Sequence, residues 1–359
     1  MDYAGRRQRL RASFGEAGIS TLVVTTPSNV RYLTGFSGSN GSVVVGPDAD
    51  RLCTDSRYFT QAEHECPDLT VIPTTTTVLE PAIQWAAADA LTPIGFEADH
   101  VTVHELERVA EHGLAHELRA TVDLVRVLRA HKDDHERGFI ARACAISDVA
   151  LSRLLGDVRV GVTERELAAR LSWLMRDEGA DGDSFESIVA GGPHSAIPHH
   201  SPTDRPLQAG DFLKIDFGAL YAGYHADETR TFVVGAPPAA WQVEIHELVA
   251  AAQRAGIAAL RLDADVREVD AAARSVIRDA GYGEYFGHGL GHGVGLDIHE
   301  VPFLGANSSG NLSVGTPITV EPGVYLPGRG GVRIEDTLIV GPDDPVSLTT
   351  TTRELLVLG

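Results

Sequence analysis

Five acidic or imidazole residues lie inside short apolar runs in the second half of the sequence. Asp216 lies in KIDFG, and Asp227 follows eleven residues later in YHADETRTF. His292 lies in GHGVGL, Glu321 in ITVEPGVYL and Glu335 in VRIEDTLIV. Burial of a charged carboxylate is costly unless the group is paired or bound to a metal. The residue types and their surroundings therefore indicate a site in which each acid needs a cation.

Few cationic side chains are available to neutralise these acids. Arg329 and Arg333 are the only Lys or Arg residues between Glu300 and Glu335. Four carboxylates and one imidazole are therefore satisfied more easily by divalent cations than by arginine. A donor set that is mostly oxygen with one nitrogen suits ions such as Mn²⁺ and Co²⁺. Several ligands able to bridge suggest two metals about 3.5–4 Å apart that activate a shared water.

Other histidines lie close to these residues in the sequence. His288, His292 and His299 lie in GHGLGHGVGLDIHE, and His199 and His200 form a separate pair in AIPHHSP. Glycine on both sides of the first two histidines allows the backbone to approach a ligand closely. The same glycines make a helix improbable, and the sequence has no HExxH motif, so a zincin-type site is excluded.

The elements that position the acids are expected to be strands. Leu213, Ile215 and Phe217 surround Asp216, and the connection GALYAGY has the composition of a turn. The runs that carry Asp216 and Asp227 are therefore predicted to pair antiparallel and to bring the two carboxylates together. Short strands and Gly/Pro turns continue from about residue 184, interrupted by helical patterns at 241–260 and 266–280. This half is predicted to be an α+β domain with a strongly bent antiparallel sheet.

The first half shows a different pattern, in which apolar strand-like runs are separated by helical segments. Helices are expected there at residues 6–17, 79–90 and 104–112, and further helices at residues 133–155, where a second domain opens, and 163–178. Strands alternating with helices predict an α/β domain that ends near residue 125. Thr163 is the expected N-cap of the last helix, with Glu166 closing a capping box.

Length and charge limit the classes of function. The 359 residues suggest two domains, and 30 Lys+Arg against 50 Asp+Glu give a net charge of -20 without a basic run. Binding to nucleic acid or to an anionic membrane is therefore not expected, because both need clustered cations. Cys53, Cys66 and Cys144 form no CxxC pair, which argues against a disulfide framework or a thiolate zinc site. The sequence also lacks a signal peptide and a membrane span, so a cytoplasmic protein is expected.

Four segments, taken in order, resemble a known family. DFGALYAGYHADETRTF, GHGLGHGVGLDIHEVP, TVEPGVYL and GVRIED are similar to the pita-bread metallopeptidases, the family of aminopeptidase P, prolidase and methionine aminopeptidase. YLTGFSGSNG and TDSRYFTQA resemble the creatinase-type N-terminal domain of the Xaa-Pro-cleaving branch. The resemblance implies a creatinase-like domain at residues 1–125 and a pita-bread catalytic domain at residues 126–359.

The resemblance also implies roles for individual residues. The metal ligands would be Asp216, Asp227, His292, Glu321 and Glu335. Asp227 and Glu335 would bridge the two ions, and Glu321 would also be the general base. His299 would steady the tetrahedral intermediate, His288 and His199 would line the substrate site, and Arg333 would anchor a ligand carboxylate or bind substrate. The chain departs from the family pattern at Ala226, at Glu228, which is expected to face solvent, and at His194, where Asn is common.

The function implied is Xaa-Pro aminopeptidase activity, with Xaa-Pro dipeptidase (prolidase) activity as the alternative. The stretch VPFLGANSSGNLSVGTP has no cation to neutralise a free proline carboxylate, which favours the aminopeptidase. A non-catalytic binding module of the same fold is a remote alternative, and creatinase and methionine aminopeptidase are disfavoured. The expected cofactors are two divalent ions, most simply Mn²⁺, with Co²⁺ or Zn²⁺ as alternatives. The expected partners are peptides with proline in second position and, as in relatives, a second copy in a homodimer.

Overall fold

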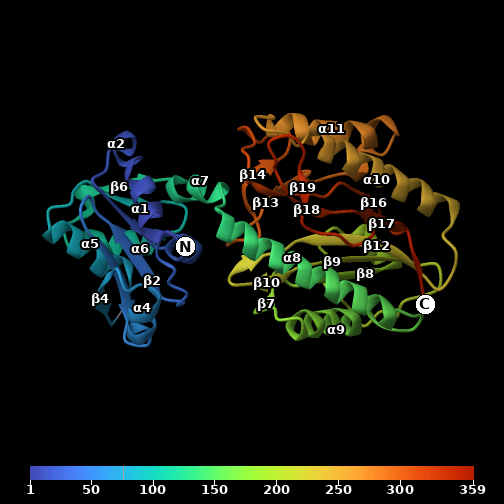
Figure 1. The fold of residues 1–359 in the computed structure, drawn as a ribbon, viewed down its shortest axis with the longest axis horizontal. Coiled ribbons are helices and arrows are strands. Elements are labelled where there is room, and N and C mark those ends of the chain that lie inside the picture. Colours follow the sequence, from blue (N-terminus) through green and yellow to red (C-terminus); the bar gives the residue numbers. More distant parts are fainter. Residues whose placement is uncertain (76) are drawn as a thin grey trace. The chain divides into compact units, whose positions relative to one another are not determined.

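The computed structural model describes residues 1–75 and 77–359, and the chain divides into two compact units, Met1–Arg129 and Ala130–Gly359 (Figure 1). The domain boundary expected after residue 125 falls inside helix α7 (Leu124–Ala130). Each unit has its own buried apolar core. In the described part of the chain, no helix is long and apolar enough to cross a membrane.

The first unit is built around a six-stranded mixed sheet with the order β4-β3-β2-β1-β5-β6. Its strands are β1 (Thr21–Val24), β2 (Gly41–Val45), β3 (Asp50–Asp55), β4 (Thr70–Thr74), β5 (Ile94–Glu97) and β6 (Leu118–Thr121). Its helices are α1 (Tyr3–Arg11), α2 (Phe14–Ala17), α3 (Pro27–Thr34), α4 (Phe59–Glu65), α5 (Leu79–Ala88), α6 (Val103–Glu111), the 3₁₀ turn η1 (Ala115–Glu117) and α7. This is the α/β domain predicted from the sequence. The helix expected at residues 6–17 is divided, because the Ser13 hydroxyl donates to the Leu10 carbonyl at 2.8 Å where the first helix ends.

The second unit contains four groups of mostly antiparallel strands. The first group is β8 (Ile188–Gly191), β9 (Phe212–Phe217), β12 (Glu228–Val234) and β20 (Val357–Leu358), and the second is β7 (Gly182–Asp183), β10 (Ala219–Tyr221) and β11 (Tyr224–His225). The third group is β13 (Gly291–Gly293), β14 (Glu300–Leu304), β15 (Pro317–Val320), β18 (Asp336–Ile339) and β19 (Val346–Ser347), and the fourth is the hairpin β16 (Gly323–Leu326) and β17 (Gly330–Arg333). The predicted α+β domain with antiparallel sheets is confirmed.

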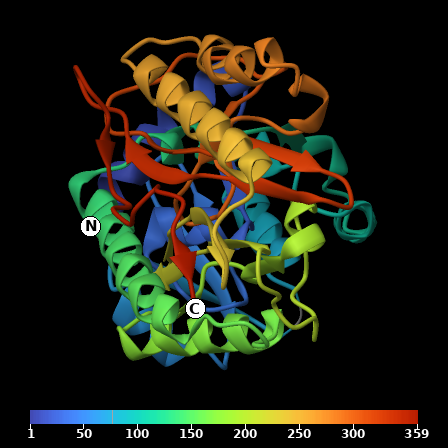
Figure 2. The same cartoon turned by 90° about the vertical axis from the view of Figure 1, so that its right-hand side faces the viewer.

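Two pairs of helices enclose these strands (Figures 1 and 2). The helical elements of this unit are α8 (Asp134–Leu154), η2 (Leu155–Asp157), α9 (Glu164–Asp177), η3 (Gly192–Ala196), α10 (Ala240–Ala259), α11 (Val266–Asp279) and η4 (Gly283–Tyr285). Helices α8 and α9 share an apolar core with β8, β9 and β12, whereas α10 and α11 share another with the strands from β13 to β18. The predicted capping box of α9 is present, since Thr163 accepts from the Glu166 amide and Glu166 accepts from the Thr163 amide. The metal-site residues lie among the strands between these helix pairs.

Candidate metal centre

The two aspartates are carried by adjacent antiparallel strands, as the sequence predicts. Strands β9 and β12 pair so that Asp216 lies opposite Thr229, and Phe217 lies opposite Glu228. Asp227 immediately precedes β12, and both aspartates are buried. The two carboxylates are near enough for Asp216 to raise the pKa of Asp227.

The other three candidate ligands come from the third group of strands, which contains β13, β15 and β18. His292 is the central residue of β13, Glu321 directly follows β15, and Glu335 directly precedes β18. β15 pairs antiparallel with β18 and also with β13, so Glu321 and Glu335 lie at the same end of neighbouring strands. An isolated bridge between Thr229 and Glu335 connects this group of strands to β12. The backbone thus brings together segments that are widely separated in the sequence.

A single cavity of about 310 Å³ is lined by all five candidate ligands, Asp216, Asp227, His292, Glu321 and Glu335. His199, His299 and Arg333 line the same cavity. His288 instead lines a neighbouring cavity of about 860 Å³, which shares His199, His292, His299, Glu321 and Arg333 with the first. The structure therefore places every predicted site residue in the wall of one or both of these cavities.

The carboxylates of this cavity are destabilised as anions. Burial raises the pKa of Asp227 and of Glu335 well above the ordinary range, and the neighbouring carboxylates raise it further. Burial raises the pKa of Glu321 to about 8, partly opposed by Arg333 and reinforced by Asp216. Without a cation, these acids would retain protons near neutral pH. A bound cation would allow them to ionise.

The imidazole of His292 is neutral and presents a lone pair to these acids. Burial lowers the pKa of His292 to about 4. Its Nδ1 lies 3.0 Å from the Gly293 carbonyl, which can only accept, so we assign the proton to Nδ1. The unprotonated Nε2 lies 3.5 Å from Asp227 Oδ2 and 3.5 Å from Glu321 Oε1. A cation between these atoms would satisfy all of them.

Two further observations support a cation at this position. One ligand atom each from Asp227, His292 and Glu335 can be chosen so that all three atoms lie within 4.8 Å of one another. Asp216 Oδ1 is buried and, among the described residues, has no hydrogen-bond partner. The donor set of four carboxylates and one neutral imidazole therefore fits divalent cations.

Arg333 binds a candidate ligand directly, which was one of the two roles expected for it. Its buried guanidinium forms an ion pair with Asp216 and donates to Thr229 Oγ1 at 3.0 Å and to the Tyr325 hydroxyl at 2.8 Å. The Tyr325 hydroxyl also lies 2.9 Å from Nε2 of His288, whose pKa burial and Arg333 lower to about 4. Tyr325 thus connects Arg333 to the neutral His288.

Thr229 and Tyr325 belong to the site but were not identified from the sequence. Thr229 donates to Glu335 Oε2 at 2.6 Å and follows Asp227 by two residues, so strand alternation could have placed it on the same face. Tyr325 lies beyond the turn that separates β15 from β16, and no local pattern connects it to His288. His299 stacks edge-on against His292 with ring centroids 4.4 Å apart.

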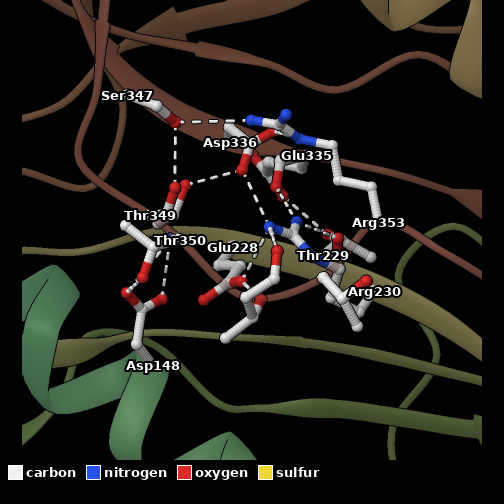
Figure 3. A network of polar contacts seen from close by, with 12 residues as sticks. Asp148, Glu228, Thr229, Arg230, Glu335, Asp336, Ser347, Thr349, Thr350 and Arg353 are labelled. Carbon is white, nitrogen blue, oxygen red and sulfur yellow. Dashed lines mark hydrogen bonds and ion pairs between the residues drawn. The ribbon is translucent and has the colours of Figure 1, made fainter.

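A second polar network lies behind the candidate ligands (Figure 3). Arg230 donates to Asp336 Oδ1 at 2.8 Å and pairs with Glu228 Oε1 at 3.0 Å. Arg353 donates to Asp336 Oδ2 at 2.6 Å. The expectation that Glu228 faces solvent is wrong: β12 is an interior strand covered on both faces, and Glu228 is 0% exposed. Burial raises the pKa of Glu228 to about 8, although Arg230 opposes this.

The fold and this donor set are those of a metal-dependent hydrolase, and comparison with known proteins identifies the family. Residues 138–342 match metallopeptidase family M24, and residues 6–131 match the Creatinase/Prolidase N-terminal domain. The chain belongs to metallopeptidase family M24.

Three relatives match nearly the whole chain. The structure of an Xaa-Pro dipeptidase from Bacillus anthracis has a TM-score of 0.95 at 37% identity and covers 99% of this chain and 100% of its own. An Xaa-Pro dipeptidase from Pyrococcus furiosus is 36% identical over 98% of this chain and 99% of its own length. The structure of an X-Pro aminopeptidase from Thermotoga maritima has a TM-score of 0.87 at 33% identity and covers 97% and 100% of the two chains.

Proposed function

We propose that the protein is an Xaa-Pro dipeptidase, which hydrolyses the bond between the first residue and the proline of a dipeptide. The observation that supports hydrolysis is the convergence of five candidate ligands with His199, His299 and Arg333 in one cavity. The restriction to dipeptides is supported by the names of the two relatives from Bacillus anthracis and Pyrococcus furiosus, each matched over nearly its full length.

The sequence alone favoured an Xaa-Pro aminopeptidase, and the relatives support the dipeptidase better. One observation keeps the aminopeptidase as a second candidate. Arg329 stacks on Trp241 with its guanidinium carbon 4.1 Å from the ring centroid, and Arg333 is paired with Asp216. Both arginines in the stretch between Glu300 and Glu335 are therefore engaged elsewhere. A free proline carboxylate would then depend on imidazole donors from His199, His288 or His299.

Two divalent cations, for which Mn²⁺ is our first expectation and Co²⁺ and Zn²⁺ are alternatives, would be held by Asp216, Asp227, His292, Glu321 and Glu335. When bound, they would lower the pKa of a water molecule and polarise the scissile carbonyl. Asp227 and Glu335 are the proposed bridging ligands, as the family resemblance implies; both carboxylates are buried, and ligand atoms of the two lie within 4.8 Å of each other.

The protein side chains supply proton transfer and orientation. Glu321 is the proposed general base, and its carboxylate accepts the proton of the attacking water. His299 and His199, which line the cavity, are the proposed donors of hydrogen bonds to the substrate carbonyl and to the oxyanion that develops from it. Arg333 holds Asp216 in place, and His288 with Tyr325 forms the wall of the larger cavity.

A comparison of substrate lengths tests this proposal. The measurement is kcat/KM for Xaa-Pro, for Xaa-Pro amide and for Xaa-Pro-Yaa with the same Xaa, after loading with Mn²⁺, and with Glu321→Gln as the inactive control. A dipeptidase should favour the free dipeptide by about ten- to a hundredfold, the value of a good charge-assisted contact of about 1.5–3 kcal/mol. Preference for the tripeptide would instead establish the aminopeptidase. Binding of peptides without cleavage would indicate the non-catalytic module.

The assembly and location of the protein remain predictions. A homodimer is expected, and light scattering coupled to size-exclusion chromatography would measure its mass. The cytoplasmic location expected from the sequence would be tested by fractionation of cells. Peptides with proline in second position remain the expected partners, and nucleic acid and membranes are not expected to bind.

A further inference from the structure

The buried carboxylate of Glu164, outside the metal centre, accepts hydrogen bonds from the end of β8 and from the loop that follows it. Glu164 is the first residue of α9 and is 0% exposed. Its Oε1 accepts from the Gly191 amide and from His194 Nδ1, both at 2.8 Å. Its Oε2 accepts from His200 Nε2 at 2.9 Å, from the Thr203 amide at 3.0 Å and from the Thr203 hydroxyl at 2.7 Å. We call Glu164, His194 and His200 the Glu164 hub.

The protonation states within this hub follow from its contacts. Burial by itself would raise the pKa of Glu164, but hydrogen bonds from Gly191, Thr203 and His200 lower it to about 2. Glu164 is therefore a carboxylate and can only accept hydrogen bonds. The nitrogens of His194 and His200 that face it must both carry protons. The two rings lie with their centroids 4.4 Å apart.

The same three residues could in principle bind a metal, since ligand atoms from each lie within 4.8 Å of one another. The hydrogen bonding argues against this. Both oxygens of Glu164 are already satisfied by five donors, and the nearby imidazole nitrogens present protons rather than lone pairs. A cation would have to displace these bonds, so the arrangement is that of a structural hub.

The donors to Glu164 lie on both sides of His199 in the sequence, and His199 lines the substrate cavities. Gly191 and His194 precede His199, and His200 and Thr203 follow it. The two residues directly before His199 are also held, because the buried Lys214 donates to the Ile197 carbonyl at 2.7 Å and to the Pro198 carbonyl at 3.2 Å. The backbone is therefore anchored on both sides of His199.

The side chain of His199 is exposed, and its imidazole makes no hydrogen bond within the described ranges 1–75 and 77–359. It nevertheless lines both cavities of the site. The location of this imidazole is therefore determined by the backbone of its loop.

We propose that Glu164 is a positioning residue, which orders the 192–203 loop through His194, His200 and Thr203 and thereby places His199 against the substrate. This inference rests on the proposed function for its catalytic part, whereas the ordering of the loop is independent of it. His194 and His200, the other residues of the Glu164 hub, transmit this effect to the loop.

The test compares Glu164→Gln with Glu166→Gln, a matched substitution of an exposed residue on the same helix whose capping role Gln can also fulfil. Hydrogen–deuterium exchange measured by mass spectrometry should become faster in peptides from residues 192–203 of the first variant only. kcat/KM of the metal-loaded enzyme should fall about ten- to a hundredfold in Glu164→Gln, as expected for a misplaced group. Unchanged exchange, or faster exchange with unchanged kcat/KM, would overturn the proposal.

A double-mutant cycle separates positioning of His199 from a general loss of structure. If Glu164 acts through His199, Glu164→Gln should have little further effect on kcat/KM in a His199→Ala background. Additive losses would contradict the proposal, as would a third metal ion per chain that is lost only in Glu164→Gln. Should Glu164→Gln fail to fold, His194→Ala, at a partly exposed position, replaces it in the same cycle with the same criteria. Absence of peptidase activity in the wild type would refute the proposed function, and the exchange experiment would still decide whether Glu164 orders the loop.

Discussion

Glu321 has two properties that bear on catalysis. It lies in the cavity among the other candidate ligands, and burial raises its pKa to about 8 in the absence of a cation. Its Oε1 is 3.5 Å from Nε2 of His292, and its Oε2 is 4.0 Å from Nε of Arg333. A carboxylate in this position can both bind a metal and accept a proton.

We expect Glu321→Gln to fold normally and to lower kcat by about 10²- to 10⁴-fold, because the amide cannot accept the proton. Metal content should fall only in part, since four other ligands remain. The measurements are steady-state kinetics and elemental analysis of the purified protein. Glu268→Gln, at an exposed position on α11, is the control and should be unaffected. A fully active Glu321→Gln enzyme would exclude the general-base role.

Asp227→Asn should have a different effect, because a bridging carboxylate would contribute to both metal positions. We expect this variant to lose most of its bound metal and its activity together, and elemental analysis would show fewer than two ions per chain. The folded structure should persist, because a neutral amide avoids the burial of charge and the repulsion by neighbouring carboxylates that raise the pKa of Asp227. Retention of two ions and full activity would show that the bridging assignment is wrong.

At the scale of elements, the network in Figure 3 ties β12 to β18 and to the C-terminal segment. Arg230 is 1% exposed, and its partners Glu228 and Asp336 are fully buried. Each partner directly follows a candidate ligand, Asp227 or Glu335, so the ligand and the network occupy opposite faces of the chain. The contacts between β12 and β18, which include the bridge between Thr229 and Glu335, therefore help to place both ligands.

Arg230→Met should lower the free energy of unfolding by about 3–5 kcal/mol, because it leaves the buried Glu228 without its cation and removes one of the two arginines that pair with the buried Asp336. Arg353→Met is the matched comparison and should cost less, because the Arg353 side chain is 43% exposed and its removal leaves the buried Asp336 still paired with Arg230. Urea denaturation of both variants would measure the difference. Equal effects of the two substitutions would show that Arg230 does not hold these strands together.

At the scale of the whole molecule, the stability of the protein should depend on buried neutral imidazoles. His246 on α10 is 5% exposed, and burial lowers its pKa to about 4. An unfolded histidine has a pKa of about 6.5. Above that value both states are neutral and the folded state has its full stability. As pH falls from about 6.5 to about 4, the unfolded chain binds a proton that the folded chain does not, and stability is lost.

This predicts a loss of about 1 kcal/mol from His246 alone between pH 7.5 and pH 5.5. His246→Leu should reduce the pH dependence of urea unfolding by that amount, and His104→Leu, at an exposed position on α6, should not. NMR titration of the His246 imidazole provides an independent measurement. A pKa near 6.5 in the folded protein would contradict this explanation.

Much of this protein could be predicted from the sequence because the information is local. The capping box of α9, the pairing of the strands that carry Asp216 and Asp227, and the two-part α/β and α+β fold all follow from nearby residue types. The five candidate ligands were also recognisable, because acids inside apolar strands need a compensating charge. Their individual roles stay predictions.

The tertiary structure decided what depends on residues distant in the sequence. Arg333 binds Asp216 across 117 positions, so the sequence could only leave open whether it binds a ligand or substrate. Glu228 is buried because β12 is covered on both faces, which alternation along one strand does not reveal. The contact of Tyr325 with His288 and the gathering of a loop around Glu164 also require the assembled fold. Hydrogen bonds and burial between such segments are set by packing, whereas residue type and spacing specify only which groups are available.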